Sequence, residues 1–157
     1  MQEFQVPKER ASVLVEIPPR PPETRFVFLA PFAQGHLGAE TPSDIFNAPQ
    51  PFVPLFREDG EAVLARRESI TWIMVGEPRR AEWYYHESRA GAPEAPVHIE
   101  FETGSHLDGR IALVGPEGSQ RVIDVVNRAG GFLPVERDEE LFLVNLRRVA
   151  SITVAGE

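Results

Sequence analysis

Apolar and polar residues alternate along this chain in short runs, which are separated by proline, glycine and other turn residues. A period of two is typical of strands that bury one face. The runs at 13–17 and 97–101 alternate in this way, whereas 26–30 and 111–114 are almost continuously apolar and predict fully buried strands. Further strands are predicted downstream of each pair, at 52–57, 61–66 and 70–75 and again at 132–137, 141–145 and 149–154.

One short helix is predicted in each half of the chain. Thr41 is followed by a proline and, three positions on, by an acidic residue, which is a typical helix start. In the second half, Ser119 is the expected cap. Asn47 and Asn127 are expected to end the two helices, because asparagine tolerates the left-handed conformation that is common at that position.

The same order of features occurs twice, which indicates an internal repeat. Asp44-Ile-Phe-Asn47 and the following Phe52-Val-Pro54 return 80 residues later as Asp124-Val-Val-Asn127 and Phe132-Leu-Pro134. Upstream, 25–31 aligns with 110–116; downstream, Arg66-Arg67 aligns with Arg147-Arg148.

The sequence therefore predicts a mainly β protein made of two units, each in the order β-β-α-β-β-β with one short helix. The first unit spans 11–76 and the second spans 97–155. Residues 77–96 join them as a linker or as a hairpin extension of the first sheet.

Five short strands with Asp-x-x-Asn at the middle of each unit resemble the Sm-like (LSm-like) small β-barrels, and especially uncharacterised bacterial domains of that general type. The resemblance covers 11–75 and 97–154 and implies two tandem small barrels of the SH3/Sm-like kind. Because Sm proteins contact RNA through this part of the fold, it also implies candidate nucleic-acid contacts at Arg66, Arg67, Arg147 and Arg148.

The charge balance argues against nucleic acid as a partner. The formal net charge is −8, and no run of Lys or Arg exceeds two residues, whereas nucleic acid is usually met by a basic surface. Only Lys8 among the 16 basic residues is a lysine, a skew associated with GC-rich bacterial genomes. The absence of cysteine excludes disulfides and thiolate chemistry. With no apolar run of signal-peptide or membrane-spanning length, we expect a cytoplasmic protein without a membrane partner.

The histidines and acids do not form a recognisable catalytic set. His98 and Glu100 share one strand face and would provide two metal ligands, but such neighbours most often face solvent together. Ser105, His106 and Asp108 lie too close in one turn to form a working triad. We therefore expect no enzyme activity, no cofactor and no metal.

Two stretches are candidate protein-binding surfaces. Trp83, Tyr84 and Tyr85 follow one another in the linker, and aromatic side chains dominate interface energetics. If 81–87 paired with the preceding strand as a hairpin, Trp83 and Tyr85 would share one face and Tyr84 would take the other. Pro19 and Pro22 belong to a proline-rich loop that is either a polyproline ligand or a stiff connection.

Three function classes remain open. The first is a non-catalytic adaptor or scaffold that binds another protein through a sheet edge or the linker aromatics, and homo-oligomerisation is compatible with it. The second is nucleic-acid or nucleotide binding of the Sm-like kind. The third is a small-ligand receptor or enzyme that uses the cleft between the two units.

Overall fold

The structure is a computed structural model that describes residues 7–155. The first unit contains β1 (Glu9–Glu16), β2 (Glu23–Leu29), α1 (Pro42–Phe46), β3 (Phe52–Phe56), β4 (Ala62–Arg66), the 3-10 turn η1 (Arg67–Ser69) and β5 (Trp72–Val75). The connection contains η2 (Arg79–Glu82) and α2 (Trp83–Ser88). The second unit contains β6 (Glu94–Phe101), β7 (His106–Ala112), α3 (Val122–Ala129), β8 (Phe132–Arg137), β9 (Glu140–Asn145), η3 (Leu146–Arg148) and β10 (Val149–Val154).

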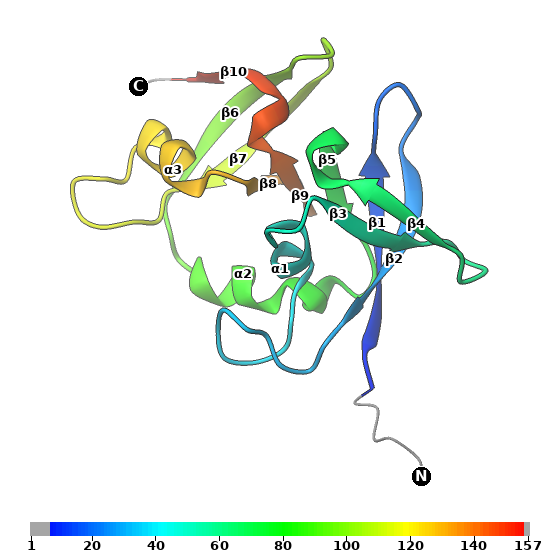
Figure 1. Cartoon of the computed structure of the whole chain (residues 1–157). Coiled ribbons are helices and arrows are strands. Elements are labelled where there is room, and N and C mark those ends of the chain that lie inside the picture. Colours follow the sequence, from blue (N-terminus) through cyan, green and yellow to red (C-terminus); the bar gives the residue numbers. More distant parts are fainter. Residues whose placement is uncertain (1–6, 156–157) are drawn as a thin grey trace.

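All ten strands belong to one antiparallel sheet in the order β10-β6-β7-β8-β9-β5-β1-β2-β3-β4 (Figure 1). Within each unit the strands follow the same order, with the fifth strand beside the first and the fourth at the far side. The prediction of a mainly β protein with the order β-β-α-β-β-β repeated is therefore confirmed.

The units do not form two separately closed sheets. In residues 7–155, no pairing joins β4 to β5 or β9 to β10; β5 pairs instead with β9 of the second unit. The sheet is thus open and continuous across the two units, with β4 and β10 as its edges.

Strand register corrects two details of the repeat alignment. Val13 and Val97 occupy the same place in the first strands of the two units. Val13 pairs with Arg25 and Val97 pairs with Gly109. Arg25 therefore corresponds to Gly109, and the match of 25–31 with 110–116 is wrong by one residue. Arg66 lies opposite Phe52 and Asn145 lies opposite Phe132. Because both phenylalanines open the third strand of their unit, Arg66 corresponds to Asn145. Counting on from there, Glu68 corresponds to Arg147, and the two Arg-Arg pairs are not equivalent.

The helix ends follow the expected capping chemistry only in part. The Thr41 hydroxyl accepts the Asp44 N–H, and the Asp44 carboxylate accepts the Thr41 N–H, so the predicted cap is confirmed. Asn47 ends α1, although its φ of −95° is not left-handed. In the second unit α3 begins after Arg121, so the prediction of Ser119 was wrong. That helix runs through Asn127 to Gly130, whose φ of 66° suits a residue without Cβ.

The two units share buried side chains at their junction. One apolar cluster centres on the first unit and another on the second. Phe132 and Leu143 of the second unit nevertheless belong to the first cluster, beside Phe46 and Ile73. The linker sequence is therefore not the only connection between the units.

Of the two alternatives for residues 77–96, a linker and a hairpin extension, the hairpin at 81–87 is not formed. This stretch forms the end of η2 and most of α2. The physical reason is that β5 has no free side, because it lies between β1 and β9. No helix within the described range 7–155 is long and apolar enough to cross a membrane.

Candidate functional site

The open edge at β4 presents both unpaired backbone groups and an apolar side chain. On the β3 side, the Arg67 N–H donates to the Pro51 carbonyl (2.8 Å) and the Arg57 N–H to the Glu61 carbonyl (2.9 Å). Hydrogen-bonded and non-hydrogen-bonded pairs alternate along antiparallel strands. This alternation turns the N–H and C=O of Leu64 away from β3, toward the open side. The Leu64 side chain is 67% exposed.

The opposite edge of the sheet is β10, which among the described residues pairs with β6 alone (Figure 1). Ile152 lies opposite Ile99 there, as Ile73 lies opposite Val15 in the first unit. Ile152 is half-buried, whereas Ser151 and Thr153 are exposed. β10 carries neither proline nor a charged residue that would oppose the addition of another strand.

The junction of β5 with β9 shows how a neighbouring strand buries the side chains of such an edge. Ile73 lies opposite Leu143, and both side chains are 0% exposed. Next to them the rings of Trp72 and Phe142 meet edge to face, with centroids 5.2 Å apart. The β4 edge has the strand geometry of β9 without this cover.

Two asparagines fasten the junction with hydrogen bonds. The Asn47 side chain accepts the Phe132 N–H (2.8 Å) and donates to the Phe132 carbonyl (3.4 Å). Asn145 is 2% exposed and donates to the Ile70 carbonyl (2.8 Å) across the same junction. A buried amide without partners costs free energy, so both contacts specify how the units meet.

The structure brings together three of the four predicted arginines. Arg66, Arg67 and Arg147 line one pocket at the junction, together with Asn47, Phe132 and Asn145. Burial lowers the pKa of Arg67. Its Nη2 donates to the Ile45 carbonyl (2.9 Å), while Nε and Nη1 are buried without a hydrogen-bond partner in the described residues. Arg148 points elsewhere, to the Glu68 carbonyl (2.7 Å).

The linker aromatics do not form one exposed surface. Tyr85 is 5% exposed, and burial raises the pKa of its hydroxyl. The Trp83 indole donates to the Ala39 carbonyl (3.1 Å) and packs over Gly38, where a Cβ would collide with the ring. Tyr84 is 42% exposed and stacks on His36 with ring centroids 4.2 Å apart. Only Tyr84 keeps a largely open face.

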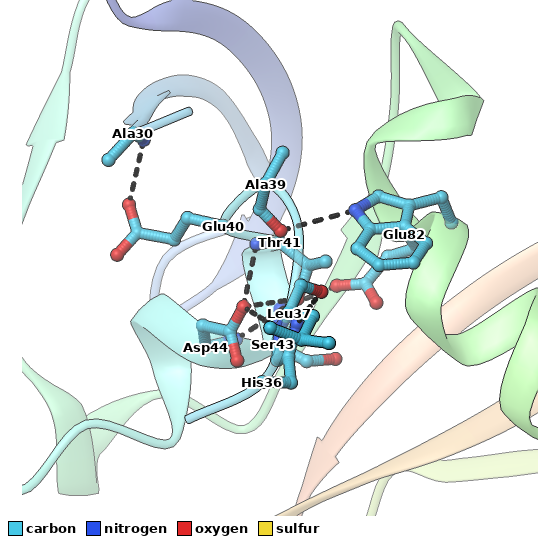
Figure 2. A network of polar contacts seen from close by, with 10 residues as sticks. Ala30, His36, Leu37, Ala39, Glu40, Thr41, Ser43, Asp44 and Glu82 are labelled. Atoms are coloured by element: carbon cyan, nitrogen blue, oxygen red, sulfur yellow. Dashed lines mark hydrogen bonds and ion pairs between the residues drawn. The ribbon is translucent and has the colours of Figure 1, made fainter. Parts of the chain in front are cut away.

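A polar network joins the loop before α1 and the start of α1 to Glu82 in the connection (Figure 2). Asp44 accepts from Thr41 and contacts His36 Nε2 at 2.8 Å. The hydrogen bond to the Leu37 carbonyl raises the pKa of His36 most, and the contact with Asp44 raises it further. Glu82 accepts the Ser43 N–H and is 1% exposed.

Desolvation by burial raises the pKa of Glu82 to about 7, against the lowering effect of the hydrogen bond from Ser43. No local pattern indicated this, since Glu82 is one acid among many until the fold buries it.

The proline loop lies beside the β4 edge. Pro19 lines a surface hollow together with Val63 and Leu64 of β4. Pro22 is exposed but does not line the hollow. The structure therefore places one predicted partner residue next to Leu64, which sequence reasoning missed as a site. The available signal was that Leu64 aligns with Leu143 in the repeat.

The other candidates for chemistry remain separate surface groups. His98 contacts Asp108 (2.6 Å) and Glu100 (3.5 Å), and the hydrogen bond that His98 donates to Asp108 raises the pKa of His98. Between residues 7 and 155, no group of three or more His, Cys, Asp or Glu residues is arranged to hold a metal ion.

Comparison with known proteins gives no relative: no family model matches the chain, and no curated protein or solved structure is significantly similar to it.

Proposed function

We propose that this chain is a non-catalytic protein-binding module whose binding surface is the β4 edge with the adjoining Pro19 hollow. The observation that carries the proposal is the exposure of Leu64, at 67%, where Leu143 at the equivalent position of β9 is 0% exposed. An apolar edge of this kind pairs readily with an added strand. Main-chain hydrogen bonds would supply affinity, and the hollow would take a side chain of the partner.

The Sm-like resemblance adds a view of the units themselves. We propose that each five-stranded unit curls as an incomplete small barrel that a neighbouring strand completes. The order shared by the units, with the fourth and fifth strands on opposite sides, supports this view. In the first unit β9 supplies the strand beside β5, while no strand within residues 7–155 lies on the outer side of β4.

Cross-linking in the source cells tests the β4 edge. A photoreactive residue replacing Ala62, which is exposed on β4, should give cross-links to polypeptide. Leu64→Pro in the same chain should remove them, because proline lacks the N–H that faces the open side. A photoreactive residue at Leu37, which is 92% exposed in another loop, is the matched control. Equal cross-linking from both positions, or none from Ala62, would contradict the proposal.

A second candidate is anion or nucleotide binding in the junction pocket. The favouring observation is that Arg66, Arg67 and Arg147 line this pocket, and that two guanidinium nitrogens of Arg67, Nε and Nη1, have no hydrogen-bond partner within the described chain. Such groups suit phosphate oxygens.

Binding of a short single-stranded oligonucleotide at low salt tests this candidate. The double variant Arg66→Ala/Arg147→Ala should weaken binding by about tenfold or more, and added salt should weaken binding to the unaltered protein. Arg57→Ala/Arg137→Ala removes two exposed arginines outside the pocket and should change the affinity little. Fluorescence anisotropy gives the dissociation constants; equal losses in the two double variants would argue against a pocket site.

A further inference from the structure

The two open edges of the sheet are repeat equivalents of the two strands that pair at the junction. β4 has the place in the first unit that β9 has in the second, and β5 has the place that β10 has. The backbone edge that β9 offers to β5 is therefore repeated on β4, and that of β5 is repeated on β10, with Arg66 in the place of Asn145 and Ser151 in the place of Trp72. One chain pairs one copy of each and leaves the other copy open.

Register predicts how the open copies would meet. Ile73 lies opposite Leu143 at the junction, so Ile152 of one chain would lie opposite Leu64 of another. Inside the chain both members of this pair are 0% exposed, whereas Leu64 is 67% exposed and Ile152 is half-buried. Pairing of the two edges would bury Leu64 as β5 buries Leu143.

The neighbouring side chains repeat the same relation. Phe132 is 6% exposed and has its backbone held by Asn47, whereas Phe52, its equivalent on β3, is 44% exposed. Asn127 corresponds to Asn47 when both are counted from the helix caps, and it is exposed. The Phe52 ring near one edge and the Asn127 amide near the other therefore occupy the positions that Phe132 and Asn47 occupy at the junction.

Charge is complementary as well. Arg147 and Glu68 form an ion pair at the junction, at 3.3 Å. Since each occupies the position equivalent to the other, a second junction would bring Arg147 of one chain to Glu68 of the next. Opposite charges would meet again with the roles exchanged.

We infer that copies of this chain join head to tail, β4 of one copy pairing with β10 of the next in the antiparallel register of β9 with β5. The inference identifies a second copy of the chain as the partner of the β4 edge, and so it rests on the proposed function. The contact is heterologous, because two different surfaces meet. It therefore closes into a ring or continues as a filament, and it leaves no edge unpaired in a ring.

Two edge-blocked variants test this arrangement. Leu64→Pro removes the N–H that β4 turns to the open side. Ile152→Pro does the same on β10, because Ile152 corresponds to Ile73, whose backbone faces β9. Each should weaken self-association by about a hundredfold or more. Leu37→Lys, a change at a leucine far from both edges in sequence, is the control and should associate as the unaltered chain does. Circular dichroism checks that each variant is folded.

Mass analysis by analytical ultracentrifugation gives the decisive comparison. The unaltered chain should form species larger than one chain of 17.5 kDa, and each proline variant alone should be monomeric. An equimolar mixture of the two variants has one intact β10 edge and one intact β4 edge to pair. It should therefore form a dimer of 35 kDa, twice 17.5 kDa, and nothing larger. Leu64→Lys and Ile152→Lys provide a second pair if proline disturbs folding.

Other outcomes overturn the inference in distinguishable ways. Dimers of Ile152→Pro alone would show β4 pairing with β4, and dimers of Leu64→Pro alone would show β10 pairing with β10. A mixture that stays monomeric would exclude head-to-tail contact. If the unaltered chain is monomeric but Ala62 still cross-links to a different polypeptide, the proposed function stands and this inference fails. If both experiments are negative, both fail.

Discussion

Phe46→Ala is expected to lower the free energy of unfolding by about 3–5 kcal/mol, the largest effect of any truncation considered for this chain. Phe46 is 0% exposed, and its ring centroid lies 5.7 Å from that of Phe132. The substitution would therefore leave a cavity between the two units rather than within one of them. Urea unfolding followed by tryptophan fluorescence measures the change.

Phe32→Ala is the matched control, because Phe32 is 79% exposed; it should change the free energy of unfolding by less than about 0.5 kcal/mol. Since Phe46 packs against the second unit, we also expect one cooperative transition for the whole chain. Two separate transitions in the unaltered protein, or a loss below about 1 kcal/mol for Phe46→Ala, would show that the shared core contributes little.

Glu82 should make the protein less stable as the pH rises toward neutral. Its folded pKa is about 7, against an ordinary value of 4.5. Below 4.5 the carboxyl is protonated in both states, and the folded state keeps its full stability. Between these values only the folded state holds the proton, so stability falls with rising pH. The whole loss, complete above pH 7, is about 3 kcal/mol.

Glu82→Gln should remove this dependence. The amide is uncharged throughout the window, and its carbonyl can still accept the Ser43 N–H that Glu82 accepts. The variant should be more stable than the unaltered chain above pH 7, by up to about 3 kcal/mol. Unfolding at pH 5 and pH 8 gives the comparison. Glu87→Gln, at an exposed site on α2, should keep the original slope; an equal change in both variants would assign the effect to net charge.

The local elements of this fold were largely predictable because their causes are local. Alternation placed the strands of both units within a few residues of their positions. The side chain of Thr41 caps α1 since the donor it satisfies is three residues away. The aromatic run at 83–85 was misjudged because its local pattern suits a strand as well as a helix. The run could not add a strand to β5, because β1 and β9, which lie far away in the sequence, pair with both sides of β5.

The candidate site was less predictable for the same reason. Pro19 was identified from composition, but its place beside Leu64 depends on how the β1–β2 loop folds against β4. The four arginines looked equivalent in the sequence, yet only register showed that Arg147 corresponds to Glu68. Leu64 carried no signal of its own, since a leucine in a strand is ordinarily buried.

The sequence by itself determined that this chain contains two copies of one β-rich unit and where their strands and helix caps lie, because apolar spacing and capping act over a few residues. Only the tertiary structure decided that β5 pairs with β9, that β4 and β10 stay open, and that Glu82 is buried. These depend on hydrogen bonds and packing between segments tens of residues apart, whose partners no local pattern specifies.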